Sequence, residues 1–217
     1  MYVGLAMHKH VPTITSDTLI TKADKMMEEH KLWILLVVED GMLKGFVAKE
    51  DIRAALPSGA TTFSKHELNY LLSKMTVKEL VRCGMPTVTP ETEIEVAAKI
   101  MHDRDLAGLA VVDKDNRLKG YISRGSMLAV LVEEMGLELG GSRIAIEVED
   151  RKGLMTEVSR VFFDLGVNIL STSTFFRGNK RLLVFRIESA DATAIAKVLT
   201  DRGYRIAGPE RFEHEWA

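Results

Sequence analysis

The sequence predicts a mixed α/β fold of the α+β kind, built from two copies of one unit and a third unit with a different pattern. Three observations support this prediction. A single shift of the chain lays PTITSDTLITKADKMMEEHKLWILLVV over PTVTPETEIEVAAKIMHDRDLAGLAVV, with Pro and Thr positions that coincide. The glycine-rich stretch GLELGG follows the second copy and is typical of a flexible joint. Beyond it, strand-like and helix-like apolar spacings follow in the order β-α-β-β-α-β.

Each copy is predicted to contain the same succession of elements. An extended piece comes first, at 13–15 and at 87–89, and a helix follows it. In the second copy we expect Thr89 to be the N-cap of this helix and Pro90 its first residue. A buried strand, a turn and a second strand come next, and a helix that reaches about Gly136 in the second copy closes the unit. The predicted boundaries are 1–57 for the first repeat and 76–136 for the second.

The connection between the copies, 58–75, has a mixed character. Residues 58–62 have the composition of a loop. Leu68, Leu71, Leu72 and Met75 have the spacing of one helix face. We expect this helix to serve packing or a subunit interface rather than a ligand site.

The third unit is predicted to span 142–213, after a linker at 137–141. Its elements are a half-buried strand at 142–149, a helix with the inward stripe Leu154, Val158, Val161 and Leu165, strands at 168–177 and 181–188, a helix at 191–202 and a strand at 204–212. Gly166 is expected to end the first of these helices as a C-cap.

Composition restricts the classes of protein and of partner. The formal net charge is −2, with 29 basic and 31 acidic residues interspersed, so no overall field favours nucleic acid or a membrane surface. The longest apolar run, LWILLVV, is far shorter than the roughly 20 residues that cross a bilayer. The first ten residues do not have the pattern of a signal peptide, and a single cysteine fits a reducing compartment. We therefore expect a cytoplasmic protein.

The repeat resembles a pair of CBS domains, through PTVTPETEIEVAAKIM, LAVVDKDNRLKGYIS and their equivalents in the first copy. The last part, with EVEDRKGLMTEVSRVFFDLGVNI, resembles an ACT domain, which implies a ferredoxin-like fold. This domain order is similar to that of bacterial acetoin-utilisation regulatory proteins. The resemblance implies adenosine nucleotides or other adenosyl ligands, such as AMP or ATP, in clefts between the CBS repeats. It also implies amino acids at ACT subunit interfaces.

The CBS signature resembles Gly-apolar-x-Ser/Thr-x-x-Asp, in which the Asp binds the ribose and the hydroxyl reaches a ribose or phosphate oxygen. The first copy has Gly45 and Asp51 but lacks the hydroxyl, and the second has Gly120 and Ser123 but has Ser126 in place of the acid. Hydrogen bonds to a charged group are worth about 1.5–3 kcal/mol, so loss of the acid weakens a site by about 10–100-fold. We therefore predict the better ribose site in the first copy, at Asp51.

Other positions complete the predicted nucleotide site. Lys49 and Arg124 occupy matching places and are expected near phosphate. By resemblance, the adenine edge is expected at Thr13, Ile14, Thr87 and Val88. Two alternatives stay open. Asp51 could only cap the helix that follows it, and the whole pair could be a dimerisation scaffold with empty clefts.

The ACT resemblance places an effector site where the first strand of the third unit meets its first helix. The predicted residues are Asp150, Gly153, Leu154, Asn168 and Ile169. Free N–H groups after Gly153 could receive a carboxylate, and Asp150 could accept from an ammonium group. Alternatively, Asp150 caps the helix and Asn168 makes a turn.

The sequence contains no convincing catalytic set. His8 and His10 form H-x-H without companion acids or cysteines, so no metal site is predicted. Cys83 has no histidine partner in pattern, and GLELGG lacks the spacing of a phosphate-binding loop. We expect a non-enzymatic regulator that requires no cofactor. It is expected to form a homodimer and to control a metabolic enzyme.

Overall fold

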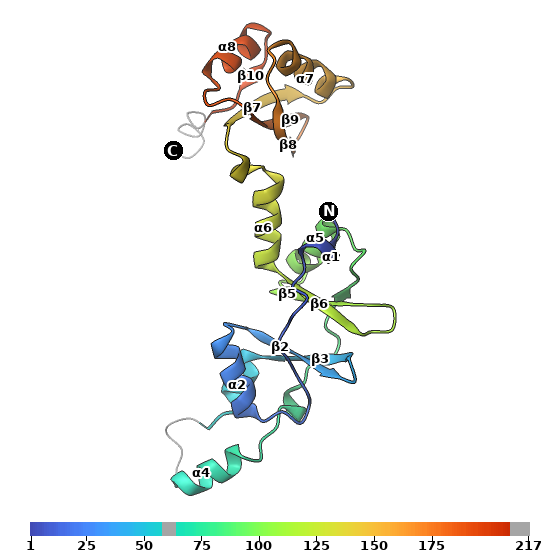
Figure 1. The fold of residues 1–217 in the computed structure, drawn as a ribbon, viewed down its shortest axis with the longest axis vertical. Helices are drawn as coiled ribbons and strands as arrows, with labels where there is room; N and C mark the ends of the chain where they lie inside the picture. Colours follow the sequence, from blue (N-terminus) through green and yellow to red (C-terminus); the bar gives the residue numbers. More distant parts are fainter. Residues whose placement is uncertain (58–63, 209–217) are drawn as a thin grey trace. The chain divides into compact units, whose positions relative to one another are not determined.

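The computed structural model of the chain describes residues 1–57 and 64–208. Two compact units are present, Met1–Leu128 and Ala129–Ala217, and Figure 1 shows their elements. The division falls within a helix, before the predicted linker at 137–141. The predicted domain boundaries stay predictions, and the loop expected at 58–62 lies outside the described residues.

The first unit contains two successions of strand, helix, two strands and helix. The first succession follows a short helix α1 (Val3–Ala6) and consists of β1 (Thr13–Ile14), α2 (Ile20–Glu29), β2 (Ile34–Glu39), β3 (Met42–Ala48) and α3 (Lys49–Ala55). Then come α4 (Lys65–Leu72) and a 3-10 turn, η1 (Lys78–Leu80). The second succession is β4 (Thr87–Val88), α5 (Ile94–Asp103), β5 (Gly108–Val112), β6 (Leu118–Ser123) and α6 (Arg124–Glu134).

The two three-stranded sheets of this unit repeat the same register. β1 lies parallel to β2 with Thr13 opposite Leu36, and β4 lies parallel to β5 with Thr87 opposite Ala110. In each sheet the next strand is antiparallel, and the pairing shifts at the equivalent point, between Val37 and Val38 or between Val111 and Val112. The predicted tandem repeat is therefore confirmed as a pseudo-symmetric pair.

The two repeats exchange the segments that precede them, which we call the leader segments, residues 1–8 and 75–82. The first leader bonds to the second repeat, through the main chain of Val3 to Thr92 and of His8 to Tyr121. The second leader forms main-chain hydrogen bonds to the first repeat, from Val77 to Thr18 and between Arg82 and Phe46. Each repeat is thus completed by a segment that lies far away in the sequence.

The exchange explains the glycine in each predicted signature. A Cβ on Gly45 would lie 2.4 Å from the carbonyl oxygen of Arg82, and one on Gly120 would lie 2.5 Å from that of His8. A side chain at either position would overlap main chain that cannot rotate away. The main chain that approaches each of these glycines closely belongs to a leader segment.

A small apolar core joins the two sheets. Its buried members are Leu36 and Leu43 from the first repeat and Ala110 and Val112 from the second. The hairpin turns also bond to one another, since Leu43 donates its main-chain N–H to Asn116 and Leu118 donates to Gly41. Apolar burial and main-chain pairing together hold the repeats as one unit.

The helix after each extended piece begins later than predicted. α5 begins at Ile94 with Glu93 as its N-cap, so the prediction of Thr89 as N-cap and Pro90 as first helical residue is wrong. Thr89 instead accepts from the main-chain N–H of Thr92, and the Thr92 hydroxyl accepts from the Thr89 N–H. The hydroxyl makes a local turn with the backbone, which competes with an earlier helix start.

The second unit has the β-α-β-β-α-β order that the sequence predicts. After η2 (Leu137–Leu139), its elements are β7 (Ser142–Glu149), α7 (Leu154–Asp164), β8 (Ile169–Arg177), β9 (Lys180–Ile187), α8 (Thr193–Asp201) and β10 (Arg205–Ile206). The sheet has the strand order β10-β7-β9-β8, and its pairs are antiparallel. This is the split βαβ arrangement. The last strand is shorter than the predicted 204–212, and its final part lies outside the described residues.

The core of the second unit differs from the predicted helix stripe at one position. Leu154, Val158 and Val161 are buried as expected, but Leu165 lies at the end of α7 and is exposed. Phe162 takes the inward place and packs against Phe185. Gly166 follows the helix with φ +64°, the left-handed conformation that the C-cap prediction requires.

Candidate functional site

A cavity of about 270 Å³ lies between the two repeats of the first unit. Its lining comes from the first leader, from Val11 and the segment 31–36 that leads into β2, and from the second repeat: His8, Val11, Lys31, Leu32, Trp33, Ile34, Leu36, Ala107, Tyr121 and Ser123. The cavity therefore joins the start of β2 in the first repeat to the signature of the second. A mostly apolar wall with a few polar groups is typical of a small-molecule site.

Two aromatic side chains give this cavity flat surfaces. Trp33 is 71% exposed although it stands at the edge of a buried strand. Tyr121 lies deeper, and burial raises its pKa to about 12. Its hydroxyl therefore keeps its proton at neutral pH and can donate a hydrogen bond. Together they contribute aromatic side chains to the lining of the cavity.

The second signature is held by a small hydrogen-bond network. The Ser123 hydroxyl lies 3.0 Å from that of Ser126, which is 7% exposed, and Ser123 also accepts from the Ser126 main-chain N–H. The Ser126 hydroxyl lies 3.2 Å from His8 Nε2. The residue in place of the predicted acid thus faces the first leader, while Ser123 also lines the cavity.

A second hollow of about 340 Å³ shares Lys31, Leu32 and Trp33 with this cavity and extends to Glu28 and Lys49. Lys49 begins α3, and its main-chain N–H donates to the carbonyl of Trp33. Within residues 1–57 and 64–208, neither lysine forms an ion pair with a carboxylate. This side of Trp33 therefore presents two cations and one acid.

The equivalent place in the second repeat is neutralised from within the chain. Arg124, the counterpart of Lys49, lies 2.5 Å from Asp105 and donates to the Leu106 carbonyl. Asp105 is the counterpart of Lys31, and both residues have positive φ. The two positions thus share the same backbone conformation but differ in charge. In the second repeat Asp105 and Arg124 form an ion pair, whereas in the first repeat Lys31 and Lys49 are both positively charged.

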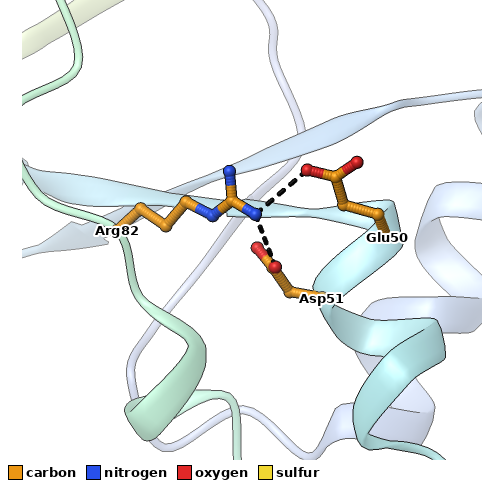
Figure 2. Close-up of polar contacts among 3 residues, drawn as sticks. All are labelled: Glu50, Asp51 and Arg82. Carbon is orange, nitrogen blue, oxygen red and sulfur yellow. Dashed lines mark hydrogen bonds and ion pairs between the residues drawn. The ribbon is translucent and has the colours of Figure 1, made fainter.

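The predicted ribose acid, Asp51, lies in an ion pair (Figure 2). Its Oδ1 is 2.6 Å from an Nη of Arg82, and the same nitrogen is 3.0 Å from Glu50. The hydrogen bond with Asp51 is the main cause that raises the pKa of Arg82, so the guanidinium stays charged. The alternative in which Asp51 caps α3 is wrong, because the N-cap is Ala48 and no side chain caps the helix.

Most of the remaining predicted nucleotide-site residues do not line either hollow. Ile14 and Val88 are buried in the sheets, and Thr13 and Thr87 point to solvent beside them. Of the ten predicted positions, Ser123 lines the cavity and Lys49 lines the adjoining hollow. The preference for Asp51 stays a prediction, and the contact with Arg82 removes the free carboxylate on which it depended.

Besides its aliphatic lining, the cavity has four polar or aromatic side chains that sequence reasoning missed: His8, Lys31, Trp33 and Tyr121. In the sequence, His8 is only one half of an H-x-H pair for which no metal site is predicted. Among the described residues, no group of three or more His, Cys, Asp or Glu side chains is placed to hold a metal ion. The repeat alignment could have indicated His8, because it places His8 opposite Arg82. Each of these residues contacts the helix after the signature of the other repeat, His8 through Ser126 and Arg82 through Asp51.

The predicted effector residues of the second unit lie on an internally paired surface. Asp150 Oδ1 is 2.6 Å from Arg181, whose guanidinium also lies over the Phe176 ring. Asn168 donates to Glu188, next to Ile169 at the start of β8. Gly153 is the N-cap of α7, before Leu154, so the alternative of an Asp150 cap is wrong. The structure therefore places a cation beside the predicted ammonium acceptor.

Comparison with known proteins identifies the first unit. The family model described as CBS domain matches residues 3–58 and 77–133. The chain belongs to the CBS domain family. A CBS domain-containing protein of Dictyostelium discoideum is 30% identical over 128 residues, which cover 58% of this chain and 88% of that protein. The CBS domain-containing protein YhcV of Bacillus subtilis is 28% identical over 138 residues, covering 64% and 89%.

Solved structures resemble this CBS pair as well. The complex of CBSX2 with AMP is 26% identical, with a TM-score of 0.50, and the match covers 61% of this chain and 96% of that one. A proposed acetoin utilization protein (AcuB) from Vibrio cholerae has the same fold at 20% identity and a TM-score of 0.53, covering 65% and 98%. Among the helices that the structure describes, none is long and apolar enough to span a bilayer.

Proposed function

We propose that this chain is a regulatory sensor that binds an adenosine-containing ligand in the cavity between its two CBS repeats. The observation that carries the proposal is the cavity itself, with Trp33 and Tyr121 as aromatic surfaces and Ser123 at its polar end. A signal follows if the ligand prefers one arrangement of the two repeats over another, because only differential affinity shifts an equilibrium.

The lining of the cavity fits the parts of such a ligand. Apolar side chains and the exposed face of Trp33 suit an adenine ring, which gains about 1–3 kcal/mol from stacking on an aromatic side chain. Ser123 and His8 offer polar groups for ribose hydroxyls. Lys31 borders both hollows, and Lys49 lies beyond it, so an anionic group that leaves the cavity past Trp33 meets positive charge.

The complex of CBSX2 with AMP supports the proposal, since that protein shares the fold and about a quarter of its residues with this chain. AMP, ATP and S-adenosylmethionine are the ligands to test first. The lysine pair favours a phosphorylated adenosine over S-adenosylmethionine, which carries a positive sulfonium.

Further parts of the proposal concern the second unit and the partners. The β-α-β-β-α-β order supports its assignment as an ACT domain that binds an amino acid near Gly153 and Asn168. A cytoplasmic homodimer that controls an enzyme of acetoin or acetyl-CoA metabolism fits the resemblance to acetoin-utilisation regulators. No catalytic set enters the proposal. If no adenosine ligand or amino acid binds, the chain is instead an assembly module with empty sites.

Replacement of Trp33 by alanine is expected to weaken binding of the preferred adenosine ligand about tenfold. Loss of one aromatic stacking contact costs about 1.4 kcal/mol, which corresponds to that factor in the dissociation constant. The side chain is largely exposed, so the fold should tolerate its removal. Isothermal titration of the full chain with AMP and ATP measures the change.

The matched control is Phe163→Ala, which removes an equally exposed aromatic ring from the second unit. This variant should bind with the affinity of the unmodified chain. Equal affinities for Trp33→Ala and the unmodified chain would exclude the cavity as the ligand site.

A further inference from the structure

We propose that Arg82 blocks the acid of the first signature from within the chain, so that one adenosine ligand binds per chain and a second site opens only when Arg82 is displaced. The inference rests on the proposed function and adds a regulation to it. The signature of the second repeat is then open to ligand, and the signature of the first repeat is occupied by Arg82.

The contact that blocks the first signature is direct (Figure 2). Asp51 Oδ1 accepts from Arg82 at 2.6 Å, and Glu50 accepts from the same nitrogen at 3.0 Å. A carboxylate that binds both hydroxyls of a ribose uses both of its oxygens. Asp51 Oδ1 already faces the Arg82 guanidinium at 2.6 Å, so a ribose hydroxyl that approaches this oxygen competes with that side chain.

The second oxygen of Asp51 differs from the first, because the hydrogen bond from Arg82 goes to Oδ1. Asp51 Oδ2 is buried and has no hydrogen-bond partner among the described residues. A buried acceptor without a donor is costly, which favours a donor that arrives from elsewhere. A ribose hydroxyl is such a donor, and removal of Arg82 leaves two acceptor oxygens for two hydroxyls.

Arg82 is held in place by the backbone rather than by the ion pair alone. Phe46 in β3 and Arg82 exchange both main-chain hydrogen bonds, at 3.0 and 2.8 Å. The guanidinium therefore starts from a fixed point beside the signature. The pair is partly exposed, and such pairs are individually weak. Arg82 consequently blocks the site because its backbone holds it beside Asp51, and a ligand with sufficient affinity can displace its side chain.

The second repeat has the same arrangement with a different side chain. His8 exchanges main-chain hydrogen bonds with Tyr121 in β6, and its ring reaches Ser126 at 3.2 Å. This histidine–serine contact stands where the first repeat has an acid and an arginine, and a cavity lies beside it. The first signature therefore holds an internal ion pair at the place where the second has a histidine–serine contact.

Titration of AMP into the full chain and into Arg82→Met tests the inference. Methionine keeps much of the length and apolar stem of arginine but has no charge. We expect the stoichiometry to rise from about one to about two ligands per chain, or a weak second event to tighten at least about tenfold. Asp51→Asn, added to Arg82→Met, should remove the second event. Arg53→Met, on the exposed side of α3, should leave the stoichiometry at one.

The outcomes separate this inference from the proposed function. Trp33→Ala combined with Arg82→Met should weaken the first event and spare the second. If the unmodified chain binds no AMP while Arg82→Met binds one that requires Asp51, the block is supported and the cavity proposal fails. An unchanged stoichiometry and affinity in both Arg82→Met and Arg82→Gln overturns the inference, as do two equal events in the unmodified chain. Thermal melting of the variants confirms that each is folded.

Discussion

A chain that lacks residues 1–8 is expected to lose about 5 kcal/mol of stability in the first unit and to lose adenosine-ligand binding. Val3 is completely buried, and burial of a valine side chain contributes about 1.5–3 kcal/mol. The segment also makes main-chain hydrogen bonds to Thr92, Pro90 and Tyr121, each worth about 0.5–1.5 kcal/mol. Because total stability is typically about 5–15 kcal/mol, much of the second repeat should unfold.

The expected loss of binding has a separate cause. His8 and Val11 both line the cavity; the truncation removes His8 and leaves Val11 near the new end of the chain, without the segment that precedes it. Urea unfolding followed through Trp33 fluorescence measures the stability of the unit. The control is Leu5→Ala, in the same segment, whose side chain is 78% exposed and should change stability by less than about 0.5 kcal/mol. A truncated chain with unchanged unfolding would contradict the exchange of leader segments.

Phe162→Ala is expected to destabilise the second unit by about 3–5 kcal/mol, the usual cost of removing a buried phenylalanine. The side chain is 1% exposed, and its ring centroid lies 5.0 Å from that of Phe185 at the centre of the core. Deletion leaves a cavity between α7 and the sheet. Calorimetric melting of the full chain should show the transition of the second unit at a clearly lower temperature.

The neighbouring residue supplies the control. Phe163 is 72% exposed and contacts Arg160 on the surface of α7. Phe163→Ala should therefore change stability by less than about 1 kcal/mol, which includes the loss of an exposed cation–π contact. Equal destabilisation by the two substitutions would show that the inward face of α7 is assigned incorrectly.

The internal repeat could be predicted because it depends on local patterns. Apolar spacing, turn residues and the coincidence of Pro and Thr positions are visible in short windows, and they identified the sheets and most helices. The start of α5 was predicted wrongly, since the same threonine and proline suit both an N-cap and a turn. The Thr92 hydroxyl decides between them, and its role depends on the turn geometry rather than on residue type.

The candidate site was harder to predict because its parts come from distant segments. The cavity joins residues 31–36 to Tyr121 and Ser123, whereas each signature motif lies within a single repeat of the sequence. The partner of Asp51 was missed for the same reason, since Arg82 belongs to the leader of the other repeat. Exchange of leaders is a property of the packed pair. It becomes visible only when both repeats are assembled.

The fluorescence of Trp33 tests the central claim most directly. The chain has two tryptophans, so Trp216→Phe leaves Trp33 as the single emitter, at the wall of the proposed site. Titration of this variant with AMP or ATP should change the emission of Trp33 in a saturable way, with the dissociation constant that calorimetry gives. An emission that stays constant while calorimetry shows bound ligand would place the ligand elsewhere and contradict the account.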